Sequence, residues 1–155
     1  MPPFEIENLN CLKQFEGREF PTTDWFVVTQ DRIQKFADAT EDRQWIHLDP
    51  GRAQRESPFA GTVAHGFLTL SLLSYFLKQT IHIRSGLALT VNYGLNKVRF
   101  PSAVRAGSPV RARVTLLCVK ESPAFVDAAF LIHVEGQPSG KPCCVAEWLI
   151  RYYSH

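Results

Sequence analysis

Two side chains suited to proton transfer lie five residues apart in the sequence, the carboxylate of Asp42 and the imidazole of His47. A positioned carboxylate and imidazole can act together as a general acid–base pair. Eighteen residues after His47, the pair His65-Gly66 opens a strongly apolar segment. An acid and a histidine at this spacing are common by chance. Each residue taken alone is therefore equally compatible with a structural role.

Both candidate side chains are expected on a loop between two short helices. Thr29 is a typical helix N-cap, and apolar residues recur at helical spacing from there to about Thr40. Pro50 favours the first turn of a second short helix, which ends at Ser57-Pro58. The predicted loop between these helices covers residues 41–47 and carries the acid near one end and the imidazole at the other.

The apolar segment from Gly66 to Gln79, GFLTLSLLSYFLKQ, leaves almost no polar side on a helix. A helix that is apolar all round is a buried helix, so we expect other elements to cover it on most sides. Thr69, Ser71 and Ser74 interrupt the segment, which is also far shorter than the ~20 residues that a bilayer span needs. The sequence therefore predicts a central helix and no membrane partner.

The second half of the chain is predicted to form β-strands that cover the central helix. Alternating apolar and polar residues predict half-buried strands at 110–118 and 144–152. A third strand is expected at 124–134, between the turn signals Ser122-Pro123 and Gly136, and a fourth at 87–100. The apolar face changes phase within the last of these, and Gly94 at the switch predicts a β-bulge. A short strand near residues 24–29 completes the sheet. The expected fold class is α+β, a curled antiparallel sheet around one helix.

Length and composition favour one domain over residues 1–155. A chain of this size removes ~68–70 % of its unfolded surface from water and needs neither disulfides nor metal to fold. The 17 basic and 15 acidic residues are dispersed, so no nucleic-acid partner is expected. The N-terminus lacks the features of a secretory signal, and the four cysteines show no CxxC spacing. We therefore expect reduced thiols and a cytoplasmic location.

Three stretches of the sequence resemble one enzyme family: FADATEDRQWIHLDP, PFAGTVAHGFLTLSLL and VNYGLNKVRFP. They are similar to the MaoC-like (R)-specific enoyl-CoA hydratases, and within them to the single-domain branch that includes NodN-like proteins. The resemblance covers about residues 26–114 and implies the hot dog fold. Many of these hydratases have Asn-Pro between the acid and the histidine, whereas residues 43–46 here are RQWI. We expect this different spacer to affect the shape of the pocket and the range of substrates.

The resemblance implies reversible hydration of a trans-2-enoyl thioester to an (R)-3-hydroxyacyl thioester. Asp42 and His47 then hold the reacting water, with His47 as the base and Asp42 as its acid–base partner, a division that the sequence leaves open. The backbone N–H of Gly66 is the expected oxyanion donor, since a glycine lets the thioester approach closely. Ser71 is expected to hold the Asp42 carboxylate, or else to bond back to a helix carbonyl. His65 is expected to hydrogen-bond loop backbone.

Partners and cofactors follow from the same resemblance. The thioester carrier, coenzyme A or an acyl-carrier protein, activates the substrate, so neither a metal nor a redox cofactor is expected. No HxxxH or HExxH spacing points to a metal site. The densest basic region, between Lys97 and Arg113, suits either the phosphates of coenzyme A, the acidic face of a carrier protein, or simple solvation. A bare sheet edge beside an apolar helix predicts a homodimer, with the site near its interface.

Two other functions remain open. The first is an acyl-thioesterase, because hot dog folds also host thioester hydrolysis. The second is a non-catalytic, NodN-like protein that binds acyl thioesters or lipid signals. Presence of both Asp42 and His47 favours the hydratase over a binding protein, which needs neither.

Overall fold

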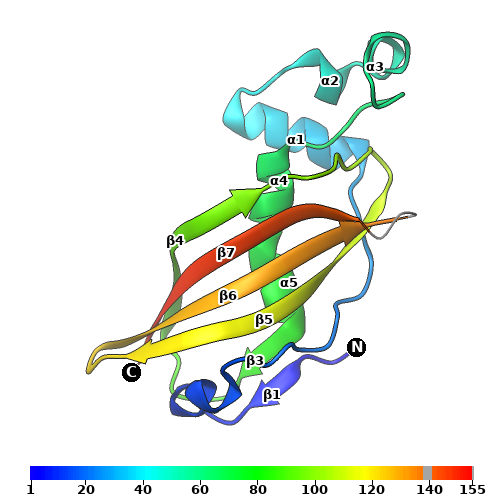
Figure 1. Ribbon diagram of the computed structural model, residues 1–155. Helices are drawn as coiled ribbons and strands as arrows, with labels where there is room; N and C mark the ends of the chain where they lie inside the picture. Colours follow the sequence, from blue (N-terminus) through cyan, green and yellow to red (C-terminus); the bar gives the residue numbers. More distant parts are fainter. Residues whose placement is uncertain (138–140, 155) are drawn as a thin grey trace.

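A curled antiparallel sheet packs around a central helical rod in the computed structural model, which describes residues 1–137 and 141–154 (Figure 1). The sheet has five strands in the order β2-β5-β6-β7-β4, and all of its pairs are antiparallel. Their bounds are β2 Phe26–Val27, β4 Leu89–Arg99, β5 Pro109–Glu121, β6 Phe125–Gly136 and β7 Pro142–Tyr153. This arrangement is the hot dog fold, and it confirms the predicted fold class.

The sheet buries one face against the rod, as the period-two pattern predicts. Side chains on this face are fully buried; they include Val110, Ala112, Val114, Leu116, Ile132, Val134, Ala146 and Ile150. The predicted bulge is present, because the register of β4 with β7 shifts between Asn92 and Gly94. A second shift falls between Leu95 and Lys97. The two irregularities bend β4 as the sheet curls.

The central rod consists of two short helices, α4 (Gly66–Ser71) and α5 (Leu73–Thr80), with Leu72 between them in a helical conformation. Phe76 is fully buried against the sheet. The rod is covered on most sides, as predicted, but one side is open, since Phe67 is 67% exposed and Tyr75 is 42% exposed. Among residues 1–137 and 141–154, nothing covers this side of the rod.

Three helices gather at the N-terminal end of the rod: α1 (Gln30–Thr40), α2 (Trp45–Leu48) and α3 (Pro50–Glu56) (Figure 1). The predicted N-cap is confirmed, because the Thr29 hydroxyl accepts a hydrogen bond from Arg32 N at 3.2 Å. The segment predicted as a plain loop contains the helical turn α2, which places His47 on a helix rather than on a loop. These helices carry the candidate site.

Two further strands close the opposite end of the rod. Strands β1 (Phe4–Ile6) and β3 (Ile81–Ile83) form a parallel pair, and the 3-10 helix η1 (Leu9–Phe15) packs beside them. Sequence patterning missed this pair, because three residues are too few to show a period of two.

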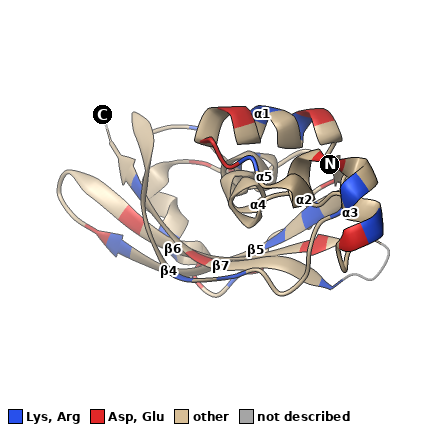
Figure 2. Ribbon diagram, turned by 90° about the horizontal axis from the view of Figure 1, so that it is seen from above, with Lys and Arg blue, Asp and Glu red and all other residues tan. Residues whose placement is uncertain are grey.

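Charge on the molecule is mixed in sign. Figure 2 shows basic and acidic segments interspersed along helices and strands. On the outer face of the sheet, Arg151 forms a two-bond ion pair with Asp127 at 2.7 and 2.8 Å, and Arg111 pairs with Glu135 at 2.7 Å. Within the described ranges, none of the helices is both long and apolar enough to cross a bilayer.

Candidate active site

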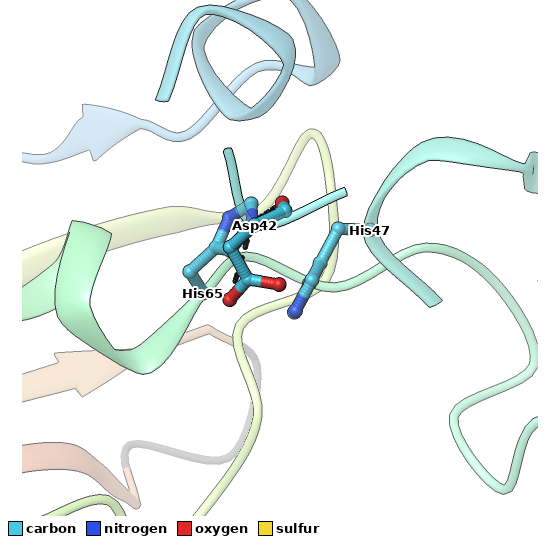
Figure 3. Close-up of side chains that lie close together, drawn as sticks. All are labelled: Asp42, His47 and His65. Atoms are coloured by element: carbon cyan, nitrogen blue, oxygen red, sulfur yellow. Dashed lines mark hydrogen bonds and ion pairs between the residues drawn. The ribbon is translucent and has the colours of Figure 1, made fainter. Parts of the chain in front are cut away.

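The structure brings Asp42 and His47 together at the N-terminal end of the rod, with His65 beside them (Figure 3). Asp42 lies on the turn after α1, His47 on α2, and His65 immediately before α4. One ligand atom from each of the three side chains lies within 4.8 Å of the others. The acid and the imidazole that the family resemblance pairs therefore lie close together in space.

The hydrogen bonding of His47 defines its tautomer. His47 is buried, and its Nδ1 lies 2.6 Å from the carbonyl oxygen of Val63. A carbonyl oxygen can only accept, so Nδ1 carries the proton and donates it. The Nε2 atom of the neutral ring is then left with its lone pair. His47 is thus set as a base whose free nitrogen lies near the Asp42 carboxylate.

Burial lowers the pKa of His47 from its ordinary value of 6.5. The hydrogen bond to Val63 and the charge of Asp42 oppose the shift, whereas neighbouring His65 adds to it. A pKa lowered in this way keeps the imidazole neutral at neutral pH, which is the form that accepts a proton.

The backbone of His47 is held by Gln30, a residue that sequence reasoning missed. Gln30 Nε2 donates to His47 O at 2.7 Å, and Gln30 Oε1 accepts from the hydroxyl of Thr62 at 2.5 Å. The first residue of α1 therefore connects α2 to the segment that precedes α4. The sequence offered no signal for this contact, because glutamine at the start of a helix is unremarkable.

His65 forms the predicted hydrogen bond to loop backbone. Its Nε2 lies 2.9 Å from Asp42 O, and since a carbonyl can only accept, Nε2 is the protonated nitrogen. The ring also stacks on His47, with centroids 3.7 Å apart and planes inclined by 23°. Figure 3 shows the Asp42 carboxylate beside the two rings; its side chain is 53% exposed.

Gly66 is the first residue of α4, so its N–H has no intrahelical acceptor. A Cβ at this position would lie 2.9–3.1 Å from carbons of the Phe100 ring. Close packing of Phe100 is therefore one structural reason for a glycine here, and the sequence did not reveal it. His47, Gly66, Thr69 and Phe100 line one open pocket of about 360 Å³.

Ser71 does not occupy the role first expected of it. Its hydroxyl donates to Phe67 O at 2.7 Å, one turn earlier on α4, and the residue is exposed. The alternative expectation, a bond back to a helix carbonyl, is what the structure has. The hydroxyl is directed along the helix backbone, so it does not hold the Asp42 carboxylate in this chain.

The three clustered side chains make a poor metal site. Nδ1 of His47 and Nε2 of His65 both donate to backbone carbonyls and cannot ligate at the same time. His65 Nδ1 is enclosed by protein. The Asp42 carboxylate and His47 Nε2 remain, two donors where zinc sites in proteins use three or four. A metal-free site stays our prediction.

The fold and this cluster define a hot dog domain with an acid–imidazole pair at the N-terminal end of its central helices. A protein-family model described as "MaoC like domain" matches residues 12–124. The chain belongs to this family of MaoC-like domains.

Three known proteins illustrate the likeness. The 3-hydroxyacyl-thioester dehydratase Z of Mycobacterium tuberculosis (strain ATCC 25618 / H37Rv) is 45% identical over 148 residues, 95% of this chain and 97% of that protein. Nodulation protein N of Rhizobium meliloti (strain 1021) is 40% identical over 143 residues, 92% of this chain and 89% of that protein. The structure of R-hydratase PhaJ1 from Pseudomonas aeruginosa is 23% identical, with a TM-score of 0.68 over 90% of this chain and 83% of that chain.

Proposed function

We propose that the protein is an (R)-specific hydro-lyase that interconverts trans-2-enoyl and (R)-3-hydroxyacyl thioesters, with residues 1–155 forming one domain. The hydrogen bond from His47 Nδ1 to Val63 O supports this proposal most strongly. It leaves a neutral imidazole with a free Nε2 beside a carboxylate, which is what activation of a water molecule requires. The similarity to a named 3-hydroxyacyl-thioester dehydratase agrees with this chemistry.

Hydration uses one water molecule held between Asp42 and His47. His47 Nε2 takes a proton from the water while the water oxygen bonds to C3, and the electron pair of the C2–C3 double bond moves toward the thioester carbonyl. The acid–base pair then returns a proton to C2 on the same face, which regenerates the carbonyl. Dehydration runs through the same steps in reverse.

Negative charge on the thioester oxygen needs a donor that is in place before the reaction. The backbone N–H of Gly66 is our candidate, because it has no acceptor within α4 and lies in the same pocket as His47. Ser71, exposed and bonded to Phe67 O, supports the site only through the helix backbone.

The carrier group of the substrate, coenzyme A or an acyl-carrier protein, supplies the activation that this chemistry needs. We therefore infer that the enzyme requires neither a metal nor a redox cofactor. A cytoplasmic location fits this dependence on carrier-bound acyl groups, and neither nucleic acid nor a membrane is part of the proposal.

A homodimer formed through β4 is part of the proposal. This edge strand pairs with β7 on one side, and Leu89, Val91, Tyr93 and Leu95 along it are 40–56% exposed. Phe67 of α4, whose ring centroid lies 6.0 Å from that of Phe100 just after β4, exposes further apolar surface. A second copy pairing along β4 would cover both the open edge and this surface. The strand leads to Phe100 at the candidate pocket, and this supports a site near the proposed interface.

Two parallel assays separate this function from its alternatives. Hydration removes the absorbance of the enoyl thioester without releasing thiol, a thioesterase releases thiol, and a binding protein does neither. We expect loss of enoyl absorbance from crotonyl-CoA or a medium-chain trans-2-enoyl-CoA, with no thiol release. Thiol release, or binding without turnover, would overturn the proposal.

A further inference from the structure

We propose that His65 is a positioning residue that holds both members of the Asp42–His47 pair in their reactive arrangement, through its ring face and its ring edge at once. The inference rests on the proposed function of that pair and assigns His65 no contact with the substrate.

The edge of the His65 ring fixes Asp42. Nε2 donates to Asp42 O at 2.9 Å, and the same nitrogen is 4.0 Å from the nearer carboxylate oxygen. Asp42 lies on an exposed turn just after α1, where a backbone is free to vary. A hydrogen bond from a side chain that is 2% exposed ties this turn to the start of α4.

The face of the same ring fixes His47. The two imidazoles stack at 3.7 Å, and Phe36 of α1 packs against His65 with ring centroids 5.0 Å apart. The His47 ring is therefore held by its Nδ1 bond to Val63 and by the His65 face. These two contacts fix both the rotation of the imidazole and the position of its Nε2.

The surroundings of the second ring nitrogen indicate that His65 adopts a single tautomer. Nδ1 is buried and has no hydrogen-bond partner among the residues that the structure describes. In the tautomer defined by the Asp42 bond, Nδ1 is a lone pair, which is tolerated more readily than an unpaired N–H.

Two substitutions at His65 test separately the hydrogen bond made by the ring edge and the stacking made by the ring face. His65→Gln keeps an amide N–H for Asp42 O and loses the ring against His47. His65→Phe keeps a ring and loses the donor. Because a displacement of about 1 Å can reduce turnover by about 10²-fold, we expect each variant to lower kcat tenfold or more, with KM changed less than about threefold. His82→Gln is the control, since His82 pairs with Glu5 at an exposed position on β3, and it should keep wild-type kcat.

The titration of His47 gives a readout that does not depend on turnover. The titratable groups that act on it from the neighbouring elements are Asp42 and His65. His65→Gln removes a neighbouring imidazole and admits water, and both changes raise the lowered pKa of His47. NMR of the ring nitrogens should show this rise and a loss of the single Nδ1–H tautomer. His65→Phe keeps the ring buried, so it should raise the pKa less.

The decisive outcome is kcat per mole of folded protein, with the folded fraction taken from thermal unfolding. Lower kcat together with a displaced His47 titration supports the inference. Unchanged kcat with only a lower Tm would overturn it, because His65 would then be purely structural. Should His65→Phe fail to fold, His65→Gln decides alone. A wild-type protein without turnover would contradict the proposed function, and the His47 titration would still test the positioning role.

Discussion

The Nδ1 atom of His47 donates its proton to the carbonyl oxygen of Val63 across 2.6 Å, in a buried setting. This contact selects one tautomer and leaves Nε2 as a base near Asp42. Val63 is also bonded to α2 through its own N–H, which donates to Ile46 O at 3.1 Å. Val63 therefore supports the imidazole through its backbone alone.

The pH dependence of kcat/KM should follow the lowered pKa of His47. Burial favours the neutral ring, so the active base form persists as the pH falls through 6.5 and is lost only below that value. We expect a flat profile across neutral pH and an acid limb with a midpoint below 6.5, measured by hydration of crotonyl-CoA in buffers of constant ionic strength. A midpoint above 6.5 would contradict the assignment of His47 as the base.

Gln30→Ala should impair turnover, although Gln30 is not one of the residues that line the candidate pocket. It removes the donor to His47 O and the acceptor for Thr62, two hydrogen bonds worth about 0.5–1.5 kcal/mol each. We expect roughly tenfold lower kcat and a lower Tm. Gln34→Ala is the matched control on the same helix, since Gln34 donates to Asp38 at the surface. Equal kinetics in the two variants would show that Gln30 does not position His47.

Gly66→Ala should destabilise the fold, although alanine ordinarily favours a helix over glycine. The new methyl group would lie 2.9–3.1 Å from the Phe100 ring and displace it, at a cost of about 1–3 kcal/mol. Gly51→Ala in α3 is the control, because its Cβ would meet only ordinary contacts at 3.5 and 3.6 Å. Thermal unfolding should show a loss for the first variant and no loss for the second. A Gly66→Ala protein as stable as the wild type would contradict the close packing of Phe100.

Assembly through β4 should be sensitive to charge on that strand. Leu95→Lys places a cation on the exposed apolar side of the edge strand and, in a symmetric dimer, two cations near each other. Sedimentation velocity should show a dimer for the wild type and dissociation for the variant. Leu117→Lys on β5, at a residue that is 37% exposed, should remain dimeric. A monomeric wild type at micromolar concentration would contradict the proposed interface.

Much of the fold was predictable because it depends on long, regular patterns. Alternation along β5 and β7 identified strands whose inner residues are largely buried, and Gly94 marked the bulge in β4. The same reasoning predicted that the central rod is covered on most sides, but not which of its apolar residues stay exposed. Phe67 and Tyr75 are apolar but exposed, and hydropathy alone cannot distinguish a core residue from an apolar residue on an interaction surface.

The candidate site was predictable only as a set of residues. Spacing and family resemblance selected Asp42, His47 and Gly66, and the structure places His47 and Gly66 in one pocket. The contacts that hold the site were not visible in the sequence, because they join distant segments, as Gln30 joins His47 to Thr62. The choice between two roles for Ser71 likewise depended on the direction of one hydroxyl.

Turnover of an enoyl thioester by the wild type, Asp42→Asn and His47→Gln tests the central claim most directly. The assay follows loss of enoyl absorbance from crotonyl-CoA and a medium-chain trans-2-enoyl-CoA, with the chirality of the product determined separately. We predict an (R)-3-hydroxyacyl product and a fall of about 10²–10⁴-fold in kcat for each variant, the loss expected on removal of a positioned acid or base. Wild-type activity that survives both substitutions, or no wild-type turnover of either substrate, would contradict the account.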